Sequence, residues 1–136
     1  MLLACGERRE YKEALSRAEA AMGDHPDSAL LILDSLGQHE KEFGRHFRMQ
    51  YLLHRTNAQN KTNVKFTSDS LAKDLVDHFD SHGTTNERVL AHYLLGRCYA
   101  DMREANTEIP EDANAFGLQE VIIKSLSLTE SEITQL

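Results

Sequence analysis

The sequence predicts an all-α fold in which antiparallel helical hairpins stack on one another, and three observations support this prediction. Apolar residues recur at intervals of three and four along most of the chain, which is the spacing of one face of a helix. The 136 residues are rich in Leu, Ala, Glu, Lys and Arg and include only two prolines and seven glycines, a composition that favours helix. Two stretches of the predicted helices recur 42 residues further along the chain, which indicates a repeated unit.

Three helices are expected in the first half of the chain, over residues 7–22, 26–36 and 40–58. Gly23 is a suitable stop for the first helix, Pro26 suits the first turn of the second, and Gly37 ends that second helix. The polar run NAQNKTN, residues 57–63, interrupts the periodicity and is predicted to be a loop. The residues expected to face inward are Tyr11, Ala14, Leu15, Ala18, Met22, Ala29, Leu30, Leu33, Leu36, Phe43, Phe47, Tyr51 and Leu52.

Four more helices are expected in the second half, over residues 69–82, 86–105 and 110–126 and from 129 onward. Ser68 or Asp69 would cap the first of these, and Gly83 would end it. Thr129 and Glu132 are spaced as a capping box at the start of the last. The inward stripes are Leu71, Leu75 and Phe79, then Leu90, Leu94, Cys98 and Met102, then Ala115, Leu118, Ile122 and Leu126.

The internal repeat groups these helices into hairpins. The stretch YLLHR at 51–55 recurs as YLLGR at 93–97, and PDSALLIL at 26–33 recurs in weaker form as SDSLAKDL at 68–75. The chain is then divided into three hairpins and the start of a further helix, over residues 7–36, 40–82, 86–126 and 129–136. Each hairpin has an apolar face that it cannot bury alone, and stacking on its neighbours would bury it, as in an α-solenoid.

Two stretches resemble the tetratricopeptide-repeat (TPR) family. LGRCY is similar to the L-G-x-x-Y core of the first helix of that repeat, with Leu95, Gly96 and Tyr99 at the matching positions. YKEALSRAEAAMGDHP, residues 11–26, resembles the second-helix pattern, although Ala18 stands where an aromatic residue is usual. The internal repeat instead makes this first helix equivalent to the third and fifth, and its shift of 42 exceeds the family's period of about 34.

As a whole, the chain resembles the N-terminal part of the TPR lipoproteins of Bacteroidetes. The resemblance implies a TPR-like α-solenoid of about six to seven helices over residues 7–136. Such a domain would be a non-catalytic scaffold or adaptor that binds a peptide or helix of another protein on its concave face. Two alternatives remain open: the sensor domain of a longer membrane-associated regulatory protein, and a small-molecule or metal-binding helical domain.

Cys5 is a candidate lipidation site. LLAC, followed by Gly6, resembles a bacterial lipobox, but neither the basic region nor the apolar stretch of roughly 7–15 residues that a secretory signal requires precedes it. Residues 1–6 are interpreted as the remnant of a lipoprotein signal, as the first apolar turn of a helix, or as the carrier of a free reactive thiol. The first interpretation places the protein in the cell envelope, lipid-anchored outside the cytoplasm, and the others leave it cytoplasmic.

The composition argues against two classes of partner. The net charge of −7 and the pI of about 5.4 are unlike those of nucleic-acid binders, which need a basic patch. The densest basic stretches, Arg8–Arg9 and Arg45–Arg48, are short and diluted by acidic residues. No apolar run approaches the ~18 residues of a membrane span. We therefore expect no nucleic acid as a partner, and a membrane only through the candidate anchor.

The sequence carries no assembled catalytic motif, and we expect no enzyme activity, no metal and no cofactor. His78 and His82 are spaced to share a helix face, with Asp80 between them, but the glutamate of the HExxH zinc motif is absent. A third ligand is not evident near this pair or in the weaker cluster of His39 and its neighbours Glu42 and His46. Cys98 falls on an apolar helix face and is expected to be buried.

Recognition is the function that remains, and the repeat suggests which residues perform it. Arg55 and Arg97 hold equivalent places in YLLHR and YLLGR and are expected to grip an acidic or C-terminal carboxylate of a partner. His54 and Asn57, near Arg55, are further candidates for partner contact. The alternative is that both arginines only solubilise the chain or pair with local acids such as Asp101.

Overall fold

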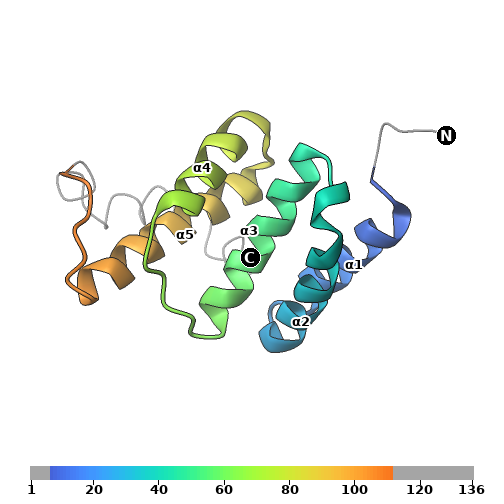
Figure 1. Cartoon of the computed structure of the whole chain (residues 1–136), viewed down its shortest axis with the longest axis horizontal. Helices are drawn as coiled ribbons and strands as arrows, with labels where there is room; N and C mark the ends of the chain where they lie inside the picture. The colour runs from blue at the N-terminus through green and yellow to red at the C-terminus, as the bar shows by residue number, and fades with distance from the viewer. Residues whose placement is uncertain (1–6, 112–136) are drawn as a thin grey trace. The chain divides into compact units, whose positions relative to one another are not determined.

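A computed structural model describes residues 7–111, and within that range it contains helices and no strand (Figure 1). The elements in chain order are α1 (Arg9–Ala21), α2 (Pro26–Leu36), the 3₁₀-helix η1 (Gly37–Glu42), α3 (Arg45–Lys61), α4 (Ser70–His82) and α5 (Thr85–Glu104). The predicted all-α class is confirmed for these residues. The helices predicted over 110–126 and from 129 lie outside the described residues, apart from Pro110 and Glu111.

The chain divides into two compact units, Met1–Thr62 (unit 1) and Asn63–Leu136 (unit 2). Unit 1 contains α1, α2, η1 and α3, and within it α2 packs on both α1 and α3. The described helices of unit 2 are α4 and α5, which pack on each other. The predicted hairpin 7–36 corresponds to α1 and α2, whereas the predicted hairpin 40–82 is divided between the two units.

The core of unit 1 forms where the apolar stripes of its helices meet. Ala18 of α1 and Ala29 of α2 are completely buried in this core. Phe43 makes edge-to-face ring contacts with Tyr11 at 5.5 Å, Phe47 at 4.9 Å and Tyr51 at 5.5 Å between centroids. These aromatic contacts join α1 to the start of α3.

The predicted helix over 40–58 is wrong at its start. Residues 37–42 form η1, the backbone is extended at Phe43 and Gly44, and α3 begins only at Arg45. Phe43 is buried with 5% of its surface exposed, so it continues the apolar spacing of Phe47 and Tyr51 from a position outside the helix. The spacing of the apolar residues therefore predicts correctly which side chains are buried, but it does not predict where the helix begins.

The predicted loop over 57–63 is wrong as well, because α3 continues to Lys61. Asn57 and Ala58 are buried, with 2% and 0% of their surfaces exposed, although the run appears polar in the sequence. The helix ends where the Thr62 hydroxyl donates to the Ala58 carbonyl at 2.9 Å and Asn63 takes a positive φ of 66°. Asparagine tolerates this left-handed conformation, so the stop signal was Asn63.

In unit 2, the connection between α4 and α5 sets the start of α5. The Thr84 hydroxyl accepts a hydrogen bond from the Glu87 N–H at 3.2 Å, and the Glu87 carboxylate accepts one from the Thr84 N–H at 3.0 Å. This reciprocal pair is a capping box, which satisfies two donors at the beginning of the helix.

Candidate protein-binding surface

Arg55 and His54, two predicted partner-binding residues on α3, both pair within unit 1. The Arg55 Nε donates to the Asp34 carboxylate of α2 at 3.0 Å, and both side chains are partly exposed, at 37% and 48%. His54 lies 3.4 Å from the Glu19 carboxylate of α1, with 16% of its side chain exposed. These neighbours therefore connect α3 to two different helices. Asn57, the third predicted residue of α3, is buried, with 2% of its surface exposed.

Arg97, on α5, pairs with a buried carboxylate of unit 2. Its Nη2 donates to Asp101 Oδ1 at 3.1 Å, and the Asp101 side chain is only 2% exposed. The same carboxylate accepts a hydrogen bond from the Phe66 N–H at 3.0 Å and lies 3.7 Å from Lys65 Nζ. Asp101 thus holds the segment that precedes α4 against α5, and Arg97 compensates its buried charge.

Both arginines are therefore occupied by carboxylates of their own units, and for Arg97 that carboxylate is the Asp101 named in the alternative interpretation. A role for them in partner binding stays a prediction. Cys5, the predicted lipidation site, lies outside the described residues.

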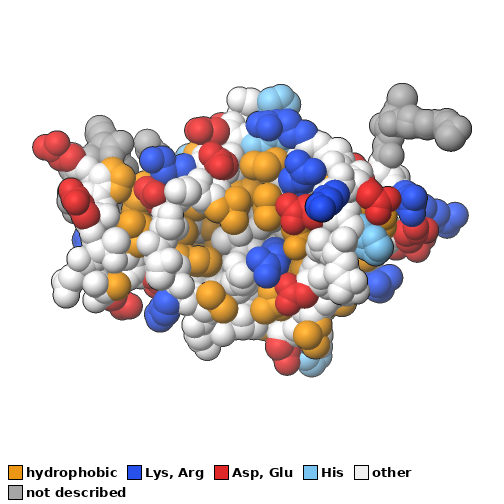
Figure 2. All heavy atoms as spheres, in the orientation of Figure 1, with side chains coloured by type: hydrophobic (Ala, Val, Ile, Leu, Met, Phe, Trp, Pro, Cys, Tyr) orange, Lys and Arg blue, Asp and Glu red, His pale blue; other side chains and the backbone are white. Residues whose placement is uncertain are grey.

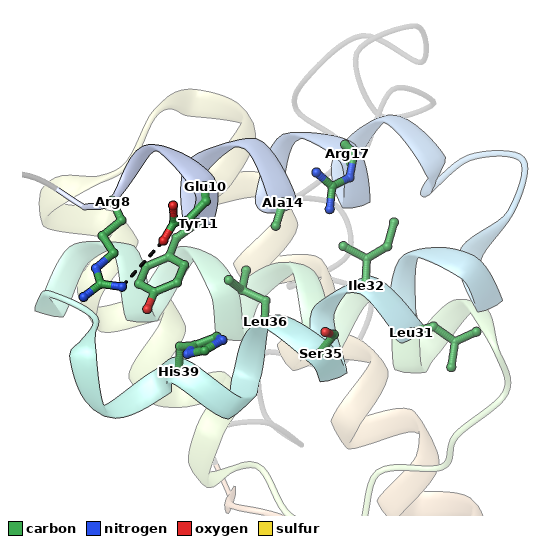
Figure 3. Close-up of a pocket in the computed structure, with 10 residues that line it drawn as sticks. All are labelled: Arg8, Glu10, Tyr11, Ala14, Arg17, Leu31, Ile32, Ser35, Leu36 and His39. Carbon is green, nitrogen blue, oxygen red and sulfur yellow. Dashed lines mark ion pairs between the residues drawn. The ribbon is translucent and has the colours of Figure 1, made fainter.

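A groove that the sequence did not single out lies between α1 and α2 in unit 1 (Figure 3). Its volume is about 470 Å³, and it is lined by Arg8, Glu10, Tyr11, Ala14, Arg17, Leu31, Ile32, Ser35, Leu36 and His39. Ala14, Ile32 and Leu36 give it an apolar floor. Leu31 lines it too and is 71% exposed, the largest exposure among the large hydrophobic residues that the structure describes.

Polar contacts satisfy one end of this groove. Arg8 lies 3.5 Å from the Glu10 carboxylate and 3.4 Å from that of Glu42, and its guanidinium stands 5.6 Å from the centre of the Tyr11 ring. The Tyr11 hydroxyl donates to Glu42 at 3.0 Å, and its ring stacks on His39 at 5.1 Å. The hydrogen bond from Tyr11 holds the pKa of Glu42 below its usual value of 4.5, and burial raises the pKa of Tyr11.

The other end of the groove is open. Arg17 projects from α1 on the side of Ile32 and Leu31, away from the cluster around Arg8 (Figure 3). It is exposed and makes no hydrogen bond or ion pair with any part of the chain that the structure describes. An unpartnered guanidinium beside exposed apolar surface is the kind of site that a partner protein can use.

A signal for this groove was present in the sequence. The run LLIL, residues 30–33, places four large apolar residues in succession on one helix. Successive residues of a helix are 100° apart, so four in a row cannot all point into one core. Leu33 takes the buried position, Leu30 and Ile32 are half-buried, and Leu31 points to solvent.

The histidines considered for metal binding have other surroundings. The rings of His78 and His82 stack at 5.0 Å, and His78 also meets the edge of Phe79 at 4.9 Å. Asp80, between them in sequence, pairs with His92 of α5 at 2.9 Å and with Arg88 at 3.7 Å. Among residues 7–111, no three His, Cys, Asp or Glu side chains are grouped as a metal ion requires.

Cys98 has the properties of a core residue. It is 2% exposed, and burial, followed by the nearby charges of Asp101 and Asp69, raises the pKa of its thiol to about 12. The thiolate is the nucleophilic form of cysteine, so a thiol with this pKa is unreactive at neutral pH.

Two further observations concern the surface charge and the apolar character of the helices. In Figure 2, acidic and basic side chains lie interspersed with one another on the surface that is shown. None of the helices described between residues 7 and 111 has the length and apolar character needed to cross a bilayer.

Comparison of the chain with protein-family models, with curated proteins and with solved structures finds no match.

Proposed function

We propose that this chain is a non-catalytic protein-binding scaffold that takes a peptide or helix of another protein on the α1–α2 face of unit 1. The observation that carries the proposal is the groove between these helices, which has an apolar floor and has Leu31, 71% exposed, along it. A single exposed leucine is ordinary, but one that adjoins the apolar floor of an open groove offers a continuous contact surface. Burying a leucine side chain contributes about 1.5–3 kcal/mol, enough to reward a partner that covers it.

The wider form of the proposal follows the sequence. It includes the TPR-like solenoid of six or seven helices inferred from the 42-residue repeat, and acylation of Cys5 as the means of attachment to a membrane. Stacked helical repeats use such surfaces for peptides and helices, and the α1–α2 pair corresponds to one predicted hairpin.

Arg55 and Arg97 differ in how costly it would be to replace their present carboxylate partners. Arg55 pairs with Asp34, and because both side chains are more than a third exposed the pair contributes little to stability. A partner carboxylate could replace Asp34 at small cost. Arg97 pairs with the buried Asp101, and removing it would leave a buried charge uncompensated. Arg55 is therefore the better candidate for partner contact.

Capture from native cell extract tests the proposal. Purified protein with Leu31→Asp should lose partners that the unchanged protein retains, as measured by quantitative mass spectrometry. Leu71→Asp is the matched control, because Leu71 is an exposed leucine of α4, outside the groove, at 39% exposure. Thermal unfolding of both variants should match the unchanged chain. Identical capture by all three proteins would contradict the proposal.

A further inference from the structure

We propose that the α1–α2 groove selects a partner segment that carries a large apolar side chain and a carboxylate close together. The apolar side chain would rest on Ala14, Ile32 and Leu36, and the carboxylate would pair with Arg17. This inference rests on the proposed function and names the chemistry of its partner.

The charges that line the groove predict the sign of the charge on the partner segment. Arg8 is already paired with two carboxylates, those of Glu10 and Glu42, so that end of the groove has no arginine left to pair with a partner. Arg17 is the basic group of the groove that pairs with no acid among the described residues. A partner carboxylate can accept two hydrogen bonds from one guanidinium, and this geometry favours a carboxylate over a neutral group.

The spacing of Ala14 and Arg17 on α1 predicts the spacing of the matching residues in the partner. Ala14 and Arg17 are three residues apart, so they lie on the same face of α1, about one turn from each other. The apolar seat and the guanidinium are thus neighbours. A helical partner would match them with an apolar residue and an acidic residue three or four positions apart, and an extended partner with two residues on one side of its chain.

The chain's overall charge limits how acidic that partner is. With a net charge of −7, the protein repels a strongly acidic segment at long range. At physiological salt the repulsion is screened beyond about 8 Å, whereas a contact at Arg17 is short-ranged. The favoured segment therefore carries one or two carboxylates beside its apolar residue rather than an acidic run.

Selection from a random peptide display library on the immobilised full chain tests this inference. We expect the enriched peptides to share a Leu, Ile, Met or Phe with Asp or Glu at a fixed spacing. The strongest peptide is then synthesised with a fluorescent label, and its affinity is measured by anisotropy for the unchanged protein and for variants.

Arg17→Glu should weaken binding of that peptide by about tenfold or more, because it replaces an attraction with a repulsion. Lys12→Glu makes the same change of charge on α1 outside the groove, and it should leave the affinity within about twofold. A peptide whose acidic residue is replaced by Lys should bind Arg17→Glu more tightly than it binds the unchanged protein.

The possible failures are distinguishable. Enriched peptides that lack an acidic residue, or that bind Arg17→Glu as tightly as Lys12→Glu, would overturn the inference about partner chemistry and leave the scaffold proposal standing. A library that yields no enriched peptide would count against both.

Discussion

Two stretches that the internal repeat makes equivalent, YLLHR in unit 1 and YLLGR in unit 2, have different physical surroundings. Arg55 reaches across to Asp34 on another helix, and that pair is open to solvent. Arg97 pairs with Asp101 one turn further along its own helix, and that carboxylate is 2% exposed. A repeat in sequence therefore preserves the position of a side chain on its helix without preserving its partner or the energy of the contact.

The largest expected difference in stability comes from replacing the carboxylate partners of the two arginines, Asp101 and Asp34, with alanine. Asp101→Ala should lower the free energy of unfolding by roughly 3 kcal/mol, because it leaves Arg97 and the Phe66 N–H without their buried partner. This value is at the lower end of the range for a broken buried pair, since Arg97 is 35% exposed. Asp34→Ala should cost less than about 1 kcal/mol. Urea unfolding of both variants measures the difference, and equal costs would remove the contrast between the units.

A second difference between the two stretches lies at the residue before each arginine, which is His54 in YLLHR and Gly96 in YLLGR. Gly96 is buried within α5, where a glycine already costs about 1 kcal/mol relative to alanine, so a steric reason for it is expected. Gly96→Leu should cost roughly 1–3 kcal/mol through overpacking. His54→Leu exchanges one large side chain for another and should cost less. A midpoint for Gly96→Leu at or above that of the unchanged protein would show that the glycine has no packing role.

Gly37 in unit 1 allows a comparable test, and here the side-chain atom that causes the collision can itself be removed by mutation. A Cβ at Gly37 would collide with the hydroxyl group of Tyr51, the tyrosine of YLLHR. Gly37→Ala should therefore destabilise by about 1–2 kcal/mol. In a Tyr51→Phe background the same change should cost less, because the colliding oxygen is gone. The control is Gly23→Ala, where a Cβ meets no atom within 4 Å. Equal costs in the two Tyr51 backgrounds would locate the strain elsewhere.

The smallest expected effect is a pH dependence in unit 1. The pKa of Glu42 is lowered in the folded protein by the Tyr11 hydrogen bond, so the carboxylate stabilises the fold above pH 4.5 and loses that contribution as the pH falls through the folded value. Glu42→Gln should lower the melting temperature slightly at pH 7 and progressively less below pH 4.5. Glu13→Gln is the control. A difference that is constant with pH would mean that the charge of Glu42 is not involved.

Periodicity in the sequence correctly predicted the all-α class and placed α1, α2, α4 and α5 within two residues at each end. It failed at α3 for a physical reason. Phe43 contributes to the core from extended backbone, and the buried Asn57 belongs to a helix although its neighbours are polar. Local spacing records which side chains are buried and does not record which backbone conformation buries them.

The candidate site was less predictable from the sequence than the fold. The predicted residues occupy positions that repeat in the sequence, whereas the structure pairs Arg55, Arg97 and His54 with carboxylates that the repeat does not relate. The groove depends on which apolar residues α1 and α3 leave uncovered on α2, and that is decided by packing between helices. The run of four apolar residues at 30–33 indicated an excess of apolar surface but could not locate it.

The measurement that tests the binding role of the α1–α2 groove most directly is site-specific photo-crosslinking in the native cell. A photoreactive amino acid is placed at Leu31, and in a matched strain at Lys12, which is exposed on α1 outside the groove. We predict discrete crosslinked products with another protein at position 31 that are absent at position 12 and are lost with Arg17→Glu. The absence of products at position 31, or the same products at both positions, would contradict a partner-binding role for this groove.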